Sequence, residues 1–387
     1  MQGSLFSGKG TVWILVRSGG EKPFKVMTVD GKGRSVAVTG WCSSQGYVEG
    51  KVAKLLEEGW EFAGRADVDS LTDEQRAMFR VTVYHVAELR SAVQKYIRRG
   101  QVQKAVDVAY TLLGDRGEMW WLSRRLPVIC AEDVGWGYMP ALLEVMDDPS
   151  EADVIEMAAR LAAAEKNKDA GWLVELAVRR KERFADSDRL GDLAAEFVVD
   201  GRYVDALACL WLLKDEEVRA ASAVLWGLSE SEVVRAIGYV CNRRLQVGAG
   251  NWDGAYLLAC WLLALKHDPP SVWPLPDCLT VQSYVDARHV VDEVDWWCFD
   301  QHTWLGKRCI GRVARRVGMR EHVLAELMFN YSSAVLSPLR GDEEYRDVAF
   351  EVMAKEFGFS SDADAEETWR RVSDDVKECI LWHLRRR

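Results

Sequence analysis

The sequence predicts a mainly α-helical protein, a stack of helical hairpins preceded by a small β-β-β-α module. Three observations lead to this fold class. β-rich runs are confined to the beginning of the 387-residue chain, helical periodicity continues almost unbroken from about residue 70, and one helical pattern occurs three times. We expect the module over residues 1–68, a helical-hairpin domain over 69–267 and a C-terminal helical region over 268–387.

The predicted module consists of three strands and one helix. The strands are TVWILVR (11–17), PFKVMTVD (23–30) and RSVAVTG (34–40), and DGKG (30–33) is expected to form a hairpin turn between the last two. Residues 48–62 place Val48, Val52 and Leu55 at helical spacing. We expect Gly59 to end this helix, because glycine readily adopts the left-handed conformation that follows a helix.

A weak internal repeat predicts the helical stack. The repeated segments are GQVQKAVDVAYTLL (100–113), GRYVDALACLWLL (201–213) and GNWDGAYLLACWLL (250–263). Each has a glycine that lets one helix end, then an alanine that lets the next helix pack closely. Such spacing is typical of tetratricopeptide-type helical hairpins, here with an irregular period. The proline-rich residues 267–278 are predicted to be a loop or a boundary inside the stack.

Charge and cysteine content limit the possible functions. The net charge of −10 opposes a broad surface for nucleic acid or anionic membrane, so such a contact would have to be local. Nine cysteines without a C-x-x-C pair indicate buried, reduced thiols in a cytoplasmic protein. No apolar run reaches eighteen residues, and we expect no membrane contact.

The stretch DQHTWLGKR (300–308) most resembles a catalytic motif, because Asp300, His302 and Thr303 stand close together. Residues two apart on a helix point in different directions, so Asp300 and His302 are not expected to pair. We expect Asp300 or Thr303 to cap the helix that follows. The sequence therefore predicts no catalytic residue, no metal site and no cofactor. An enzyme would need a pocket with further polar groups converging on this pair.

A basic stripe is the strongest candidate for binding. The predicted helix over 306–320 has six basic residues and no acidic one: Lys307, Arg308, Arg312, Arg315, Arg316 and Arg320. Such a stripe can hold phosphates at roughly one charge per contact. It can equally pair with acidic residues or form a subunit interface. A smaller basic patch is predicted at Lys95, Arg98 and Arg99, near a helix end where cations are also favoured electrostatically.

Two motifs carry a resemblance to a known family. AVQKYIRRGQVQKAVDVAYTLL (92–113), followed by RRLPVICAEDVG (124–135), resembles the C-terminal helical region of the replication-associated recombination protein A family, the bacterial AAA+ ATPases related to Werner helicase-interacting protein. The matching positions lie within 91–135 and are Gln94, Lys95, Ile97, Arg98, Ala105, Arg124, Arg125, Leu126, Glu132, Asp133 and Gly135. DQHTWLGKR is similar to a D-x-H-T-x-x-G element of relatives of that region, through Asp300, His302, Thr303 and Gly306.

Three positions depart from this pattern. Trp304 and Leu305 stand where the relatives carry arginines, and Pro127 is expected near the first turn of its helix. The resemblance implies an all-helical region, related to clamp-loader collars, that mediates tetramerisation. In the family this region follows an ATPase that acts at stalled or gapped replication forks.

The ATPase motifs are missing from this chain. The stretch GSLFSGKGT (3–11) approaches a P-loop, but Gly10 stands where a Ser or Thr should follow Lys9. EDVG (132–135) is surrounded by helical sequence and is not a Walker B strand end.

The charges of RRLPVICAEDVG are predicted to form a structural clamp. Arg125 lies two helical turns from Glu132 and Asp133, about 10–12 Å along a helix axis, which is too far for a direct pair. We therefore expect each end to bond to a neighbouring helix or to capping backbone groups, as partly buried charges must.

Two functions follow as expectations. The first is a non-catalytic accessory protein of DNA replication, recombination or repair, encoded by a phage or prophage, which forms a homo-oligomer, a tetramer by resemblance. Its N-terminal module and basic stripe would contact DNA or replication proteins. The second is an α-helical protein-interaction scaffold that binds no nucleic acid. An exposed basic ridge on the folded chain favours the first, and arginines paired with acidic residues favour the second.

Overall fold

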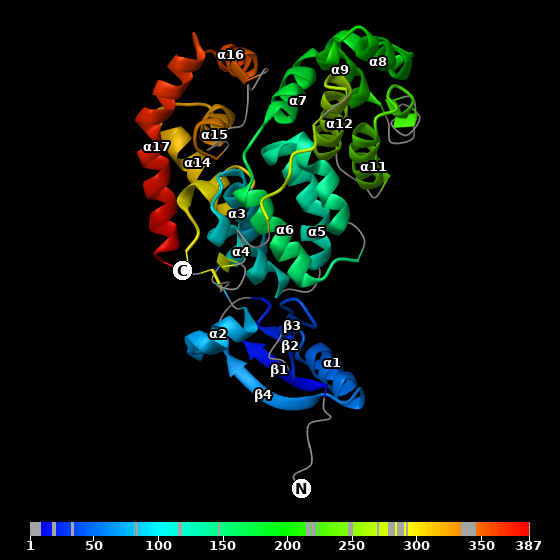
Figure 1. Ribbon diagram of the computed structural model, residues 1–387. Helices are drawn as coiled ribbons and strands as arrows, with labels where there is room; N and C mark the ends of the chain where they lie inside the picture. Colours follow the sequence, from blue (N-terminus) through cyan, green and yellow to red (C-terminus); the bar gives the residue numbers. More distant parts are fainter. Residues whose placement is uncertain are drawn as a thin grey trace.

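The computed structural model describes residues 9–17, 21–31, 35–80, 82, 84–114, 118–145, 148–213, 217, 222–223, 225–246, 251–268, 271–277, 283–284, 290–291, 293–333 and 346–386. Figure 1 shows a small sheet with two flanking helices near the N-terminus and a larger helical body. The prediction of a mainly helical chain with a small N-terminal α/β module is confirmed.

The module is a four-stranded mixed sheet. Its strands are β1 (Gly10–Val16), β2 (Phe24–Asp30), β3 (Ser35–Ala37) and β4 (Glu61–Asp67), in the order β3-β2-β1-β4. β1 pairs antiparallel with β2 and parallel with β4. Helix α1 (Gln45–Glu57) packs Val48 and Val52 against β1 and β2. Part of the predicted DGKG turn lies outside the described residues.

The fourth strand was not predicted. The helix predicted from residue 48 was expected to end at Gly59, and α1 does end nearby, at Glu57; the strand that begins at Glu61 was not expected. Gly59 has a φ of 93° in the turn between them, which confirms its expected role at the helix end. β4 is an edge strand with mostly exposed side chains, so it lacks the apolar alternation by which a strand is recognised.

The helices and short helical turns of the described residues follow in chain order. They are η1 (Val68–Ser70), α2 (Asp73–Phe79), α3 (Val86–Arg98), α4 (Val102–Leu113), α5 (Glu118–Ile129), the π-helical η2 (Cys130–Val134), the 3₁₀ helix η3 (Trp136–Val145), α6 (Glu151–Ala163), α7 (Asp169–Arg180), η4 (Lys181–Phe184), α8 (Leu190–Val199), α9 (Tyr203–Leu212), α11 (Glu232–Gln246), α12 (Asn251–Lys266), η5 (Trp296–Cys298), α14 (Trp304–Val317), α15 (Glu321–Met328), the π-helical η6 (Phe329–Ser333), α16 (Arg346–Glu356) and α17 (Asp362–Leu384).

The repeated segments form the predicted hairpins. α3 packs on α4, α8 on α9 and α11 on α12. Gly100 and Gly201 adopt left-handed φ angles of 69° and 72° at the turns, while Gly250 lies outside the described residues. The repeat alanines, Ala105, Ala206 and Ala255, are buried between the packed helices.

One hydrophobic core extends from Leu89 in α3 to Ile380 in α17, so helices on both sides of residue 268 share it. The predicted loop has no regular secondary structure over residues 271–277 and packs onto this core through Trp273. A Cβ on Gly135 would come within 2.6 Å of the Trp273 ring, which explains why the motif has glycine at this position. Within the described segments, no helix has the length and apolar character needed to cross a membrane.

Arg80 joins the module to the helical body. It ends α2 with a φ of 51°, and its guanidinium lies 2.9 Å from Oε2 of Glu151 and 4.2 Å from the ring centre of Tyr110. On the other side, α2 contributes Phe79 to the core beneath the sheet.

Candidate functional site

The two sequence motifs meet at one open cleft with a volume of about 1110 Å³. Helices α3, α5, α7, α12, α14 and α15 contribute to its walls, together with the turn before α14. The motif residues that line it are Gln94, Lys95, Arg98, Arg125, Glu132, Asp300 and His302. Two stretches about 170 residues apart in the chain therefore form a single unit.

Arg98 is the centre of a buried ion network on the cleft floor. Its side chain is 1% exposed, and Nε donates to Oδ1 of Asp133 at 2.5 Å while Nη2 donates to Oε1 of Glu132 at 3.2 Å. The Gln94 amide donates to both carboxylates, at 2.7 and 3.0 Å. Burial, together with the adjacent Asp133, raises the pKa of Glu132. The acidic end of the motif is thus bonded to α3, as predicted for a structural clamp.

Arg125 connects α5 to two further helices. Its Nη1 lies 2.5 Å from Oδ1 of Asp253 in α12, and Nη2 donates to Oε1 of Gln94 in α3 at 3.1 Å. Nη2 also lies 3.6 Å from Oε2 of Glu132. The prediction that Arg125 and Glu132 are too far apart to pair is wrong, because two long side chains converge along the helix over the π-helical turn η2.

Arg124, the first arginine of the motif, lies in a different environment from Arg125. Arg124 stacks over the ring of Trp120 at 3.9 Å and stays outside the ion network. Pro127 lies in the last turn of α5 and not in its first, so that expectation is wrong. Proline has no N–H to donate, and the chain widens into the π-helical turn three residues later.

The second motif is joined to the first by Lys95. Its Nζ lies 2.7 Å from Oδ2 of the fully buried Asp300 and also donates to Oγ of Ser91 at 2.6 Å. Oδ1 of Asp300 accepts the backbone N–H of His302 at 2.9 Å and lies 3.1 Å from its Nδ1. Burial opposes the charge of Asp300, but Lys95 and His302 outweigh it and hold the pKa of Asp300 below its usual range.

The prediction that Asp300 and His302 do not pair is therefore wrong. It assumed helical geometry, whereas residues 300–303 form a turn in which side chains two apart can meet. Thr303 is the N-cap of α14, and its Oγ1 accepts the Gly306 N–H at 3.0 Å, as expected. A Cβ on Gly306 would overlap the carbonyl oxygens of Phe299 and Asp300, so only glycine fits there.

The charged groups on the cleft floor are bonded to one another. A pocket does lie at Asp300 and His302, and the His302 side chain is 61% exposed. However, both oxygens of Asp300 and the guanidinium groups of Arg98 and Arg125 are engaged by the contacts described above. This is the geometry of a structural ion network.

The smaller basic patch does not form the predicted surface. Lys95 and Arg98 are buried and engaged by Asp300, Glu132 and Asp133. Arg99 stacks over Trp297 at 3.8 Å, and burial lowers its pKa. These residues therefore do not form an exposed basic patch, because the end of α3 is covered by η5 and held by the ion network.

The predicted stripe does form an exposed surface, which we call the basic ridge, although α14 ends at Val317 and Arg320 is the N-cap of α15. Its members are Lys307, Arg308, Arg312, Arg315, Arg316 and Arg320, and all six are exposed. Among the described residues, Arg316 is the one member within ion-pair distance of an acidic side chain, 2.5 Å from Oδ1 of Asp375. Cys309 and Val313 are buried on the opposite face of α14, and Val317 is partly exposed.

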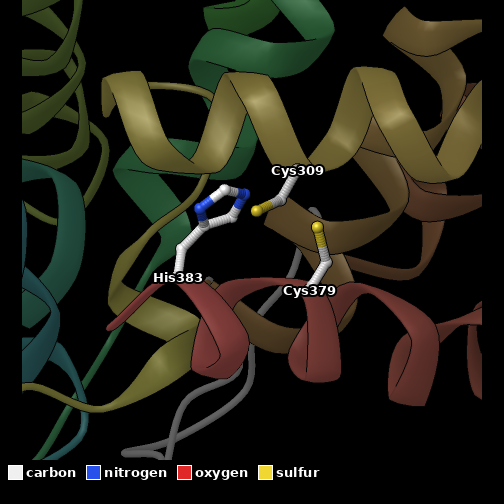
Figure 2. Close-up of side chains that lie close together, drawn as sticks. All are labelled: Cys309, Cys379 and His383. Atoms are coloured by element: carbon white, nitrogen blue, oxygen red, sulfur yellow. The ribbon is translucent and has the colours of Figure 1, made fainter. Parts of the chain in front are cut away.

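One cluster was missed from the sequence. Cys309 of α14 lies beside Cys379 and His383 of α17, and Figure 2 shows the three side chains converging between the two helices. The spacing of Cys379 and His383, four residues apart on one helix face, was the available signal. Their partner is seventy residues earlier in the chain, so only the folded structure identifies it. Cys278 lies outside the described residues; the other cysteines are free thiols.

The comparisons with known proteins do not extend the resemblance. No protein-family model, curated protein or solved structure matches the chain. The likeness to the replication-associated recombination protein A family therefore depends on the residues of the two motifs that meet at the cleft.

Proposed function

We propose that this chain is a non-catalytic accessory protein of DNA replication or recombination that holds the phosphate backbone with the basic ridge. The observation that carries the proposal is the exposure of six cations, five on α14 and one at the start of α15, in a protein with a net charge of −10. Cations that are not neutralised within the fold are available to replace the counterions of DNA. The meeting of both family-like motifs at one cleft agrees with a collar-like oligomerisation region.

An exposed tryptophan favours single-stranded DNA as the ligand. Trp304 at the start of α14 is 67% exposed, and the guanidinium of Arg308 lies 5.2 Å from its ring centre. An aromatic ring beside a basic ridge suits a single strand, whose bases stack on the ring while its phosphates contact the cations. Trp304 stands where the relatives have an arginine, so stacking replaces a charge at this position.

The double variant Arg312→Gln/Arg315→Gln tests the ridge. For single-stranded DNA, each lost phosphate contact should reduce the steepness of a plot of log K against log salt by about 0.7. The double variant loses two contacts, so the slope should become shallower by about 1.4. Salt-titrated fluorescence anisotropy on single-stranded and forked DNA measures it. Arg183→Gln/Arg235→Gln removes the same charge from two exposed positions elsewhere and should leave the slope unchanged. Equal losses in both variants would show that the ridge has no specific role.

Trp304→Ala tests the stacking contact separately. We expect single-strand binding to weaken about 5- to 150-fold, equivalent to about 1–3 kcal/mol for one stacked base, with duplex binding unchanged. Trp120→Ala is the matched control, since Trp120 is 59% exposed and also carries an arginine over its ring. Equal weakening of single-strand and duplex binding would contradict the stacking role.

The scaffold function is the alternative outcome of the same experiments. If the wild-type chain binds none of these DNAs at low salt, the DNA proposal fails and the helical hairpins serve protein partners instead. A solution mass measurement tests the proposed homotetramer independently of DNA.

A further inference from the structure

We propose that Cys309, Cys379 and His383 bind one thiophilic divalent cation of the Zn²⁺ class, which ties α17 to the helix that carries the basic ridge. The three ligand atoms all lie within 4.8 Å of one another. Two thiols and an imidazole are donors that Zn²⁺ prefers, at about 2.3 Å for sulfur and about 2.0–2.1 Å for nitrogen. Those bond lengths place tetrahedral ligands roughly 3.5–4 Å apart, so small side-chain adjustments would close the site.

The two helices pre-position these ligands. Cys379 and His383 are one turn apart on α17, and the same helix buries Val376 and Ile380 in the shared core. Cys309 is fully buried on α14, which packs along α17. Figure 2 shows the His383 ring and both sulfur atoms directed into the space between the helices. The donors are therefore held by packing that does not depend on the ion.

A neighbouring hollow reaches one of the three ligands, Cys379. Cys379 also lines an open hollow of about 410 Å³, together with Arg312, Arg316, Asp375, Glu378 and Trp382. Three protein ligands with water in the fourth position is the arrangement of an accessible zinc site. Both cysteines would bind as thiolates, so uptake of the ion displaces their two protons and strengthens as pH rises.

Metal uptake by the reduced full-length chain tests the proposal. After removal of metal with a chelator, Zn²⁺ is titrated in competition with a chromophoric chelator, and Co²⁺ is added separately to record its visible spectrum. We expect one ion per chain and a sulfur-to-cobalt charge-transfer band with intense tetrahedral d–d bands. An absence of uptake, or a spectrum of octahedral oxygen-ligated cobalt, would overturn the proposal.

Ligand variants locate the ion. His383→Ala changes a half-buried residue and should preserve the fold, which circular dichroism checks. Cys379→Ser is a separate variant that removes a different ligand. Each should bind Zn²⁺ at least about a hundredfold more weakly, since loss of outer-shell partners alone costs about 10–100-fold. Cys42→Ser, a half-buried cysteine of the N-terminal module, should bind as wild type does.

Two results would contradict this assignment. Unchanged affinity in both ligand variants would place the ion elsewhere. A Cys309–Cys379 disulfide in the purified chain, seen as two fewer titratable thiols than the nine in the sequence, would make the pair a crosslink and not a metal site.

Discussion

Replacing Arg98 by methionine should lower the free energy of unfolding by about 3–5 kcal/mol, as expected when one partner of a buried ion pair is removed. The guanidinium is fully enclosed and bonds to both Asp133 and Glu132. Without it, two adjacent carboxylates stay buried with no central cation, and the connection from α3 to η2 is weakened to neutral hydrogen bonds such as those of Gln94. Denaturant unfolding followed by circular dichroism measures the change.

A surface ion pair provides the control for this prediction. Arg65→Met breaks a pair with Glu49 in which both side chains are about half exposed, and such pairs contribute about 0–1 kcal/mol. Adding Asp133→Asn to Arg98→Met should restore part of the lost stability, because it removes an uncompensated buried charge. A loss below about 1 kcal/mol for Arg98→Met would contradict the clamp role.

Replacing Lys166 should change how stability depends on pH. Lys166 is fully buried just after α6, where Nζ lies within hydrogen-bond distance of the carbonyl oxygens of Leu161, Ala162 and Ala164. Burial lowers the pKa of Lys166 from 10.5 to about 7. Between these values the unfolded chain binds a proton that the folded chain does not. The stabilising contribution is therefore complete above about pH 10.5 and is lost as the pH falls to about 7.

The difference between wild type and Lys166→Met isolates this effect. We expect the stability of wild type relative to the variant to rise by about 1.4 kcal/mol per pH unit above pH 7, approaching about 5 kcal/mol over the whole window. Unfolding measured at several pH values between 7 and 9.5 gives the slope. Lys166→Gln removes the same titrating group. The stability difference from wild type should therefore change with pH at the same slope, displaced by a constant amount. A difference independent of pH would show that the folded lysine keeps its proton.

The helical hairpins were predictable because their determinants are local. A glycine in the left-handed region ends one helix, and an alanine at a fixed distance allows close packing of the next, as Gly100 and Ala105 do. A cap at the start of α14 was predictable for the same reason, since it follows from a few consecutive residues, whereas the exposure of the basic ridge was left open because it depends on how α14 packs. Strand β4 was not, because an exposed edge strand carries no apolar alternation.

The cleft was only partly predictable. The sequence indicated that the acidic end of RRLPVICAEDVG would bond to other helices. However, the spacing on an ideal helix predicted that Arg125 does not pair with Glu132 and that Asp300 does not pair with His302, and both pairs form. Both errors arise where the backbone leaves α-helical geometry, at a π-helical turn and at a tight turn.

By itself, the sequence determined the helical class, the hairpin repeats and the cations of α14, because helix periodicity and capping act over a few residues. Tertiary structure alone decided which charges meet. Lys95 pairs with Asp300 across 205 residues, and Cys309 faces Cys379 and His383 from a different helix. These contacts depend on how whole helices pack on the shared core, and that packing left the ridge of α14 exposed while burying Lys95 and Arg98.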